Sequence, residues 1–281
     1  MTGTSGDLPS TDTEPRPAVD PLLRVATAVA AVATIAVAFL GSGAVIGTPV
    51  SEVADGALST DATLVAPAGP AFAIWSVIYL GLLALAVWQA FAPAERTARF
   101  RGVGRLVVAS LVLNAIWVLV VQAEAIALSV GVIAALLVVL VVTLVRLNRT
   151  PAGGPAEIVL LDGIMGLYLG WVCIATVANT AAALVDQGVD ATGDAATTWA
   201  ELILIVAGFV GMGLAVALGG RFAPALGLGW GLAWVAVART DAPESDVVAI
   251  TAALASAATL AAVAVVRWRA PQVDHLDELA R

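Results

Sequence analysis

The chain has 281 residues, of which 60% are hydrophobic and 12% are charged, and its mean hydropathy is +0.99. Soluble domains are about 45–50% apolar and about 25% charged, so this composition excludes an ordinary water-soluble enzyme. The formal net charge of −8 excludes nucleic acid as a partner, because phosphates bind basic surfaces. With one cysteine and one histidine, the chain has no intrachain disulfide framework, and zinc sites and Ser-His or Cys-His catalysis are not expected.

The apolar residues form blocks of about 20 residues, the length that crosses a bilayer core of roughly 30 Å. Residues 1–20 are predicted to be a disordered tail, and the first apolar block is too long for a signal-peptide core, so we expect a retained anchor. Residues 270–281 are expected to form a polar tail. The predicted fold is an all-α polytopic membrane bundle of eight transmembrane helices, at residues 22–46, 70–91, 105–121, 125–147, 158–184, 199–218, 222–238 and 247–268.

The arginines predict the orientation of this bundle. All 13 basic residues are arginines, and with the N-terminus inside only Arg239 falls in an outer segment. This distribution follows the positive-inside rule, whereas the predicted outer loops carry acidic residues. We therefore expect both termini in the cytoplasm and a multi-pass protein of the cell membrane, with the prokaryotic plasma membrane as the expected location.

Aromatic and polar residues gather on one face of three helices. Helical spacing gives shared faces to Trp75 and Tyr79 in the second helix, to Asn114 and Trp117 in the third, and to Tyr168, Trp171, Ala175 and Asn179 in the fifth. In the predicted topology all three faces lie in the outer half of the membrane. Aromatic surfaces with a few polar groups are typical of small-molecule sites, and an amide facing lipid is costly. Two interpretations stay open: a ligand cavity, or amides that bond each other or the backbone while the rings fill the core.

These residues resemble the tryptophan-rich sensory protein family, TspO/MBR, whose mitochondrial member is the translocator protein. The family pattern P-x7-W-x3-Y is matched by Pro67, Trp75 and Tyr79, and N-x2-W by Asn114 and Trp117. The pattern Y-x2-W-x3-A-x3-N is matched by the stripe in the fifth helix. The family's W-x-F/L-G-P and Phe-Phe motifs are not kept.

The resemblance covers about residues 22–184 and implies a five-helix bundle whose cavity binds flat apolar ligands, notably porphyrins and other tetrapyrroles. Three further helices, at residues 199–269, mark a longer and divergent branch. The resemblance also implies a homodimer. The family's sterol-recognition segment is absent from residues 180–185, so cholesterol transport is not expected. The chain is thus interpreted as a membrane binding or sensor protein, and enzyme activity is not expected, although the porphyrin degradation suggested for some members stays open.

No cofactor is expected to be required, with porphyrin or haem as the candidate ligand. The predicted membrane helices contain no histidine that could be the axial ligand of a haem iron. Cys173, Tyr168 and Met165 are therefore the remaining candidates for an axial ligand. We expect a metal-free or weakly ligated tetrapyrrole held by stacking.

Asp162 lies inside the fifth predicted helix, and an acid within a membrane segment is a candidate functional residue. It is the candidate proton site of an alternative function, a proton-coupled small-molecule transporter. In the alternative, structural interpretation, the Asp162 side chain reaches the inner membrane interface or pairs with Arg146 or Arg149. No second acid is spaced to form a catalytic pair with it.

Small residues predict close helix contacts, and two tryptophans in the seventh predicted helix have two interpretations. The GxxxG pairs, which let helix backbones approach closely, are Gly43/Gly47, Gly166/Gly170 and Gly227/Gly231.

Trp230 and Trp234 share one helix face and either pack against neighbours or line a second cavity.

Overall fold

The computed structural model describes residues 19–41, 52–54, 56–191 and 193–279. Within them, seven helical segments are long and apolar enough to cross a membrane, and a shorter apolar helix, Phe222–Ala238, accompanies them. This confirms the predicted polytopic helix bundle. The elements are α1 Pro21–Gly41, η1 Gly69–Ala73, α2 Ile74–Phe91, η2 Ala94–Thr97, α3 Ala98–Gln122, α4 Ile126–Asn148, α5 Pro155–Glu157, η3 Ile158–Gly163, α6 Ile164–Asp186, α7 Gly193–Ala217, α8 Phe222–Ala238 and α9 Asp246–Leu279.

Several boundaries differ from the predicted ones. Helix α3 begins at Ala98 rather than at residue 105, because a helix can continue through the arginines that flank an apolar block. Helix α9 continues through Pro271 to Leu279, so most of the expected polar tail is helical. The expected disordered tail, Gly43 and Gly47 lie outside the described residues, apart from residues 19 and 20.

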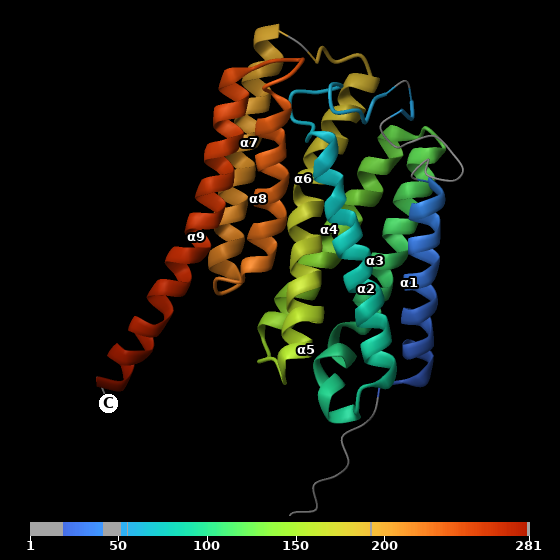
Figure 1. Cartoon of the computed structure of the whole chain (residues 1–281), viewed down its shortest axis with the longest axis vertical. Coiled ribbons are helices and arrows are strands. Elements are labelled where there is room, and N and C mark those ends of the chain that lie inside the picture. Colours follow the sequence, from blue (N-terminus) through green and yellow to red (C-terminus); the bar gives the residue numbers. More distant parts are fainter. Residues whose placement is uncertain (1–18, 42–51, 55, 192, 280–281) are drawn as a thin grey trace, which may run out of the picture.

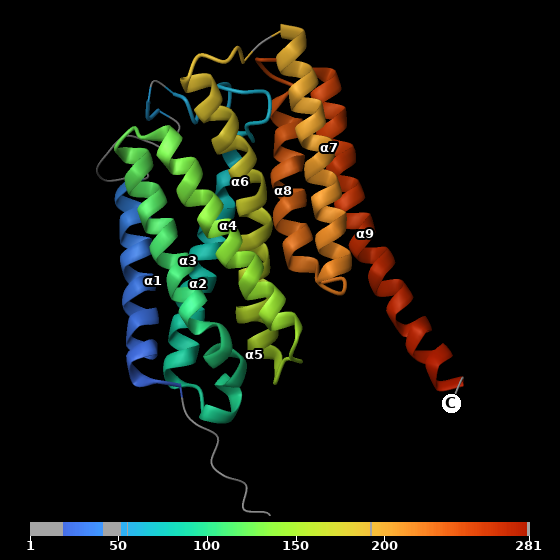
Figure 2. The same ribbon diagram turned by 180° about the vertical axis from the view of Figure 1, so that it is seen from behind.

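The helices run roughly parallel to one axis (Figures 1 and 2), with α1, α2 and α3 on one side and α7 and α9 on the other. The first residues of α1 and the last of α9 lie at the same end. Arg24, Arg99, Arg146 and Arg221 belong to this end, which we call the arginine-rich end; Arg239 belongs to the opposite end.

Helix α6 is the centre of the bundle. In the most apolar stretch of the segment Pro155–Asp186, 56% of the residues are buried inside the bundle. In the corresponding stretches of the other spans, 22–39% of the residues are buried. It packs against α4 on one side and α8 on the other, and α8 in turn packs against α9. Side chains that α6 projects are therefore the ones best placed to form an internal site.

Glycines bring α6 and α8 into direct backbone contact. A Cβ atom on Gly170 would collide with the carbonyl oxygen of Pro224, and one on Gly227 would collide with the carbonyl oxygen of Leu167. The two described GxxxG pairs therefore face each other, as close packing in lipid requires.

The segment that leads into α6 at the arginine-rich end is not a regular α-helix. Residues Ile158–Gly163 form a π-helical stretch between α5 and α6, where the sequence predicts an uninterrupted helix. Such stretches are rare and frequently occur at functional sites, and Asp162 lies within this one.

Candidate ligand cavity

Aromatic rings from α2 and α6 pack against one another. The ring of Trp75 stacks on that of Tyr79, with centroids 5.2 Å apart and planes 17° apart. It also makes edge contacts with Tyr168 and Trp171, with centroids 5.8 and 6.1 Å apart. Phe72 of η1 adds an edge contact of 5.5 Å to Trp171. Stacked and edge-on pairs at these distances are favourable geometries, so the predicted faces of the second and fifth helices do meet.

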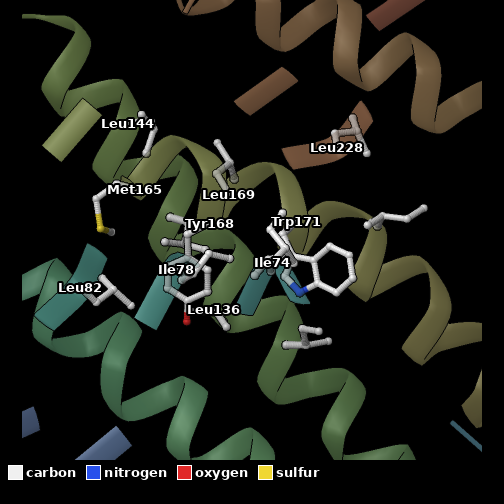
Figure 3. Packing of buried hydrophobic residues seen from close by; sticks show 14 of the residues in the cluster. Ile74, Ile78, Leu82, Leu136, Leu144, Met165, Tyr168, Leu169, Trp171 and Leu228 are labelled. Atoms are coloured by element: carbon white, nitrogen blue, oxygen red, sulfur yellow. The ribbon is translucent and has the colours of Figure 1, made fainter. Parts of the chain in front are cut away.

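Figure 3 shows how α6 presents these rings. Tyr168 and Trp171 project from the same side of the helix and lie beside Ile74 and Ile78 of α2. Both aromatic side chains are fully or almost fully buried. Helical spacing of three residues produces this shared face.

Two amides join the helices at the same site. The Tyr79 hydroxyl donates a hydrogen bond to Asn114 Oδ1 at 3.0 Å. Trp117 Nε1 donates to Asn179 Oδ1 at 3.1 Å, and Asn179 Nδ2 donates to the Ser129 hydroxyl at 2.8 Å. The amides thus bond side chains of neighbouring helices, rather than each other or the backbone. Ser129 was not among the predicted residues, since one serine in an apolar helix carries no distinguishing pattern.

A small cavity lies between these side chains and the loop before η1. We call it the aromatic cavity; its volume is about 50 Å³. Six of the eight predicted site residues line it: Trp75, Asn114, Trp117, Trp171, Ala175 and Asn179. Tyr79 and Tyr168 instead contact the ring of Trp75. Phe72, Thr63, Ile133 and Leu136 also line the cavity, and the sequence analysis missed them because they carry no polar pattern at helical spacing.

Three buried polar atoms, each on a residue that lines the cavity, have no hydrogen-bond partner among the described residues. They are Asn114 Nδ2, Trp171 Nε1 and Thr63 Oγ1. The residues are 1%, 1% and 5% exposed. Because an unpaired buried polar group costs about 1–3 kcal/mol, such groups in native proteins call for an explanation. Two of the three can only donate, so the complementary group is an acceptor.

Residues 56–68, the cover segment, close the cavity at the end opposite the arginines, and α8 holds the end of this segment. The backbone nitrogen of Ala68 donates to the carbonyl oxygen of Trp234 at 3.1 Å. Trp230 Nε1 donates to the carbonyl oxygen of Ala71 at 2.9 Å. The rings of Trp230 and Trp234 also contact each other edge-on. These two tryptophans therefore attach the end of the cover segment and the adjoining η1 to α8.

Arg239 makes a third attachment. Its side chain is almost fully buried and donates hydrogen bonds to the carbonyl oxygens of Thr60, at 2.7 Å, and Pro243, at 3.2 Å. Burial lowers the pKa of Arg239, which the nearby charge of Asp61 opposes. A hydrogen bond from the Ser59 hydroxyl holds the pKa of Asp61 below its usual value. Arg239, the one arginine predicted in an outer segment, thus acts as a clamp that holds the cover segment through Thr60.

Asp162 lies in a separate charge cluster at the arginine-rich end. Arg99 binds both carboxylate oxygens, at 2.8 and 3.0 Å, and Arg221 approaches Oδ1 at 2.6 Å. The pairing with Arg146 or Arg149 is wrong, because the partners of Asp162 are Arg99 of α3 and Arg221, the residue that precedes α8. Asp162 precedes Trp171 by nine residues, or about 13 Å along a helix, and it does not line the aromatic cavity.

The candidate axial ligands also lie away from the cavity lining. Cys173 lines a different groove, which Trp199 of α7 also borders. Met165 and Tyr168 are fully buried in the core. Among the residues that line the aromatic cavity, none is a cysteine, a methionine or a tyrosine.

A family model described as TSPO-like protein matches residues 24–266 of the chain. The match begins in α1 and ends in α9, so it continues well past residue 184, where the resemblance was expected to end. No curated protein and no solved structure matches the chain.

Proposed function

We propose that this chain, which belongs to the TSPO-like protein family, binds a flat apolar molecule with hydrogen-bond acceptors in the aromatic cavity. The observation that carries the proposal is the set of three buried, unpaired polar atoms on residues that line one cavity. An acceptor on the ligand would pair with the two nitrogen donors. Because the rings of Trp75 and Trp171 are 84° apart, one ring would stack on the ligand's plane and the other would contact its edge. Tetrapyrroles are the ligand class that the family resemblance implies.

Binding of a molecule of this size requires the cavity to expand. Its volume of about 50 Å³ exceeds that of a water molecule but is far below the 300–1,000 Å³ of ordinary ligand pockets. The cover segment is the wall that moves at least cost, since turns rather than long helices form it. We therefore propose that the ligand enters by displacing residues 56–68 from the helix ends.

The lining favours a tetrapyrrole without a coordinated metal. It offers no thiolate, thioether or phenol to an iron atom, so stacking and hydrogen bonds would supply the affinity. The carboxylates of a porphyrin are suitable acceptors for Asn114 Nδ2 and Trp171 Nε1, since hydrogen bonds to charged groups are worth about 1.5–3 kcal/mol.

Tryptophan fluorescence tests the proposal. Protoporphyrin IX is titrated into the full-length protein in lipid nanodiscs, with a Trp75→Phe/Trp171→Phe variant and a Trp199→Phe/Trp268→Phe control. We expect quenching of the wild type and of the control, and much weaker quenching of the first variant. Unchanged wild-type fluorescence, or equal quenching in the first variant, would contradict the proposal; loss of quenching only in the control would place the ligand in the groove beside α7.

A Thr63→Val variant gives a sharper test. The hydroxyl has no partner among the described residues, so its removal should leave the stability of the ligand-free protein unchanged or higher. If the hydroxyl binds the ligand, the same variant weakens porphyrin binding by about 2- to 12-fold, which corresponds to 0.5–1.5 kcal/mol. Equal affinity in the variant and the wild type would remove Thr63 from the site.

Proton-coupled transport through Asp162 is the second candidate function, since this acid is 8% exposed inside a membrane-spanning segment. Its two oxygens already contact arginines, so carrying a proton would require the charge cluster to open. Porphyrin flux into proteoliposomes under a proton gradient decides the question: a carrier role predicts that Asp162→Asn abolishes the flux, and unchanged flux rejects that role.

The location and the oligomeric state remain proposals. We infer that the protein lies in a prokaryotic plasma membrane with its arginine-rich end in the cytoplasm, and that it forms a homodimer as the family resemblance implies. A C-terminal alkaline phosphatase fusion should be inactive if the C-terminus is cytoplasmic. Native mass spectrometry of the purified protein distinguishes a monomer from a dimer.

A further inference from the structure

A further hollow lies at the arginine-rich end, between the π-helical stretch, α8 and α9. We call it the arginine groove; its volume is about 660 Å³. It exists because α8 has only 17 residues, or about 25 Å, which is less than a bilayer core of roughly 30 Å. The turn between α7 and α8 therefore stops short of the ends of the neighbouring helices (Figure 1).

Two arginines line this groove with part of their hydrogen-bonding capacity unused. Arg221 donates from Nε to Asn148 Oδ1 at 3.1 Å and approaches Asp162 through Nη1, so Nη2 has no partner among the described residues. Arg267 lies over the ring of Phe222, with its Cζ 4.8 Å from the centroid. Arg267 forms no ion pair within the described part of the chain.

The charges around the groove leave one positive charge unbalanced. Arg99 and Arg221 contact Asp162, and Arg99 also approaches Glu157 at 3.7 Å. These two arginines and two carboxylates cancel. Arg267 is the extra cation, and it is exposed. A group with a single negative charge therefore complements the groove.

The remaining walls of the groove are apolar and exposed on the surface of the helix bundle. Ile158, Val159 and Leu226 line it and are 51–58% exposed. Ile164 and Leu167 extend the same wall along α6. A ligand of the groove thus has a charged head beside the arginines and an apolar chain that follows α6 and α8.

We propose that the arginine groove binds one anionic phospholipid, with its phosphodiester between Arg221 and Arg267 and one acyl chain against Leu226. Guanidinium groups bind phosphate oxygens in a bidentate manner. Basic pockets between transmembrane helices on the cytoplasmic side bind anionic head groups, and this groove lies at the end that the arginines assign to the cytoplasm. The site is independent of the aromatic cavity, because the two cavities share no residue.

Lipid binding to the delipidated full-length protein, followed by native mass spectrometry, tests this site. The probes are phosphatidylglycerol, which carries one negative charge, and zwitterionic phosphatidylcholine. Arg267→Gln removes the extra cation, and Arg269→Gln is the matched control, since Arg269 is also exposed in α9 but does not line the groove. Leu226→Trp fills the apolar wall, and Leu254→Trp is its control on an exposed position of α9.

We expect the wild type to retain one phosphatidylglycerol in preference to phosphatidylcholine. Arg267→Gln should lower that preference about fivefold, since one arginine near the surface contributes about 1 kcal/mol toward an anionic lipid, and Arg269→Gln should not. Leu226→Trp should weaken phosphatidylglycerol binding, unlike Leu254→Trp. Equal effects of the two arginine variants, equal binding of both lipids, or displacement of the lipid by millimolar inorganic phosphate would overturn the proposal.

Discussion

Replacement of Gly170 by alanine adds a single methyl group where α6 meets α8. The new Cβ would collide with the carbonyl oxygen of Pro224 and would lie 2.6 Å from the backbone nitrogen of Leu228. Neither atom can move by rotating a side chain, because both belong to the backbone of α8. The two helices must therefore separate or shift along each other.

The magnitude follows from two opposing effects. Alanine in place of glycine favours the helix by about 0.8–1.0 kcal/mol. Overpacking of a dense interior costs about 1–3 kcal/mol, and more where the clash cannot relax. Because the clash is with backbone, we expect the upper part of that range and a net loss of about 2 kcal/mol. Since Trp171 is the next residue on α6, the same shift should also weaken porphyrin binding.

Reversible unfolding in mixed micelles, followed by tryptophan fluorescence, measures this loss. Gly213→Ala is the matched control, because a Cβ on this glycine of α7 meets nothing within 4 Å. We expect the control to be as stable as the wild type or slightly more stable. If Gly170→Ala unfolds at the same denaturant concentration as Gly213→Ala, the contact between α6 and α8 is not as close as described.

Three further substitutions test the charge cluster, the clamp and the amide network. Asp162→Asn leaves two arginines without their shared partner and should cost about 3–5 kcal/mol of stability in the same unfolding assay; a loss below 1 kcal/mol would contradict a buried cluster. Arg239→Gln removes a charge-assisted hydrogen bond to Thr60, worth about 1.5–3 kcal/mol, and should speed hydrogen exchange in the cover segment without changing exchange in α6. Ser129→Ala leaves Asn179 Nδ2 unpaired and should cost about 1–3 kcal/mol; an unchanged midpoint of unfolding would show that this amide has another partner.

Much of the candidate site could be predicted because it depends on helical periodicity. Trp75 and Tyr79, four residues apart, do stack, and Tyr168 and Trp171, three apart, both contact the ring of Trp75. A spacing of three or four residues fixes a shared helix face whatever surrounds it. Which helices turn these faces toward one another was a hypothesis drawn from depth and from the family resemblance.

The partners of single polar residues could not be predicted in this way. Asp162 binds Arg99 and Arg221, which precede and follow it by about 60 residues, rather than the arginines at the end of the preceding helix. Asp162 also lies in the π-helical stretch, whose hydrogen bonds join residues i and i+5, and regular helical spacing does not predict such a stretch. Likewise, no local pattern links Arg239 to Thr60 in the cover segment.

The amino-acid sequence alone determined the membrane environment, the succession of apolar helices along the chain and the residues that share a helix face. These properties follow from hydrophobicity and from the fixed geometry of the helix, which act over neighbouring residues. Only the tertiary structure decided the close contact of α6 with α8, the attachment of the cover segment and the partners of each buried charge. These depend on how each helix is rotated against residues far away in the chain, and small changes in that rotation replace one set of contacts with another.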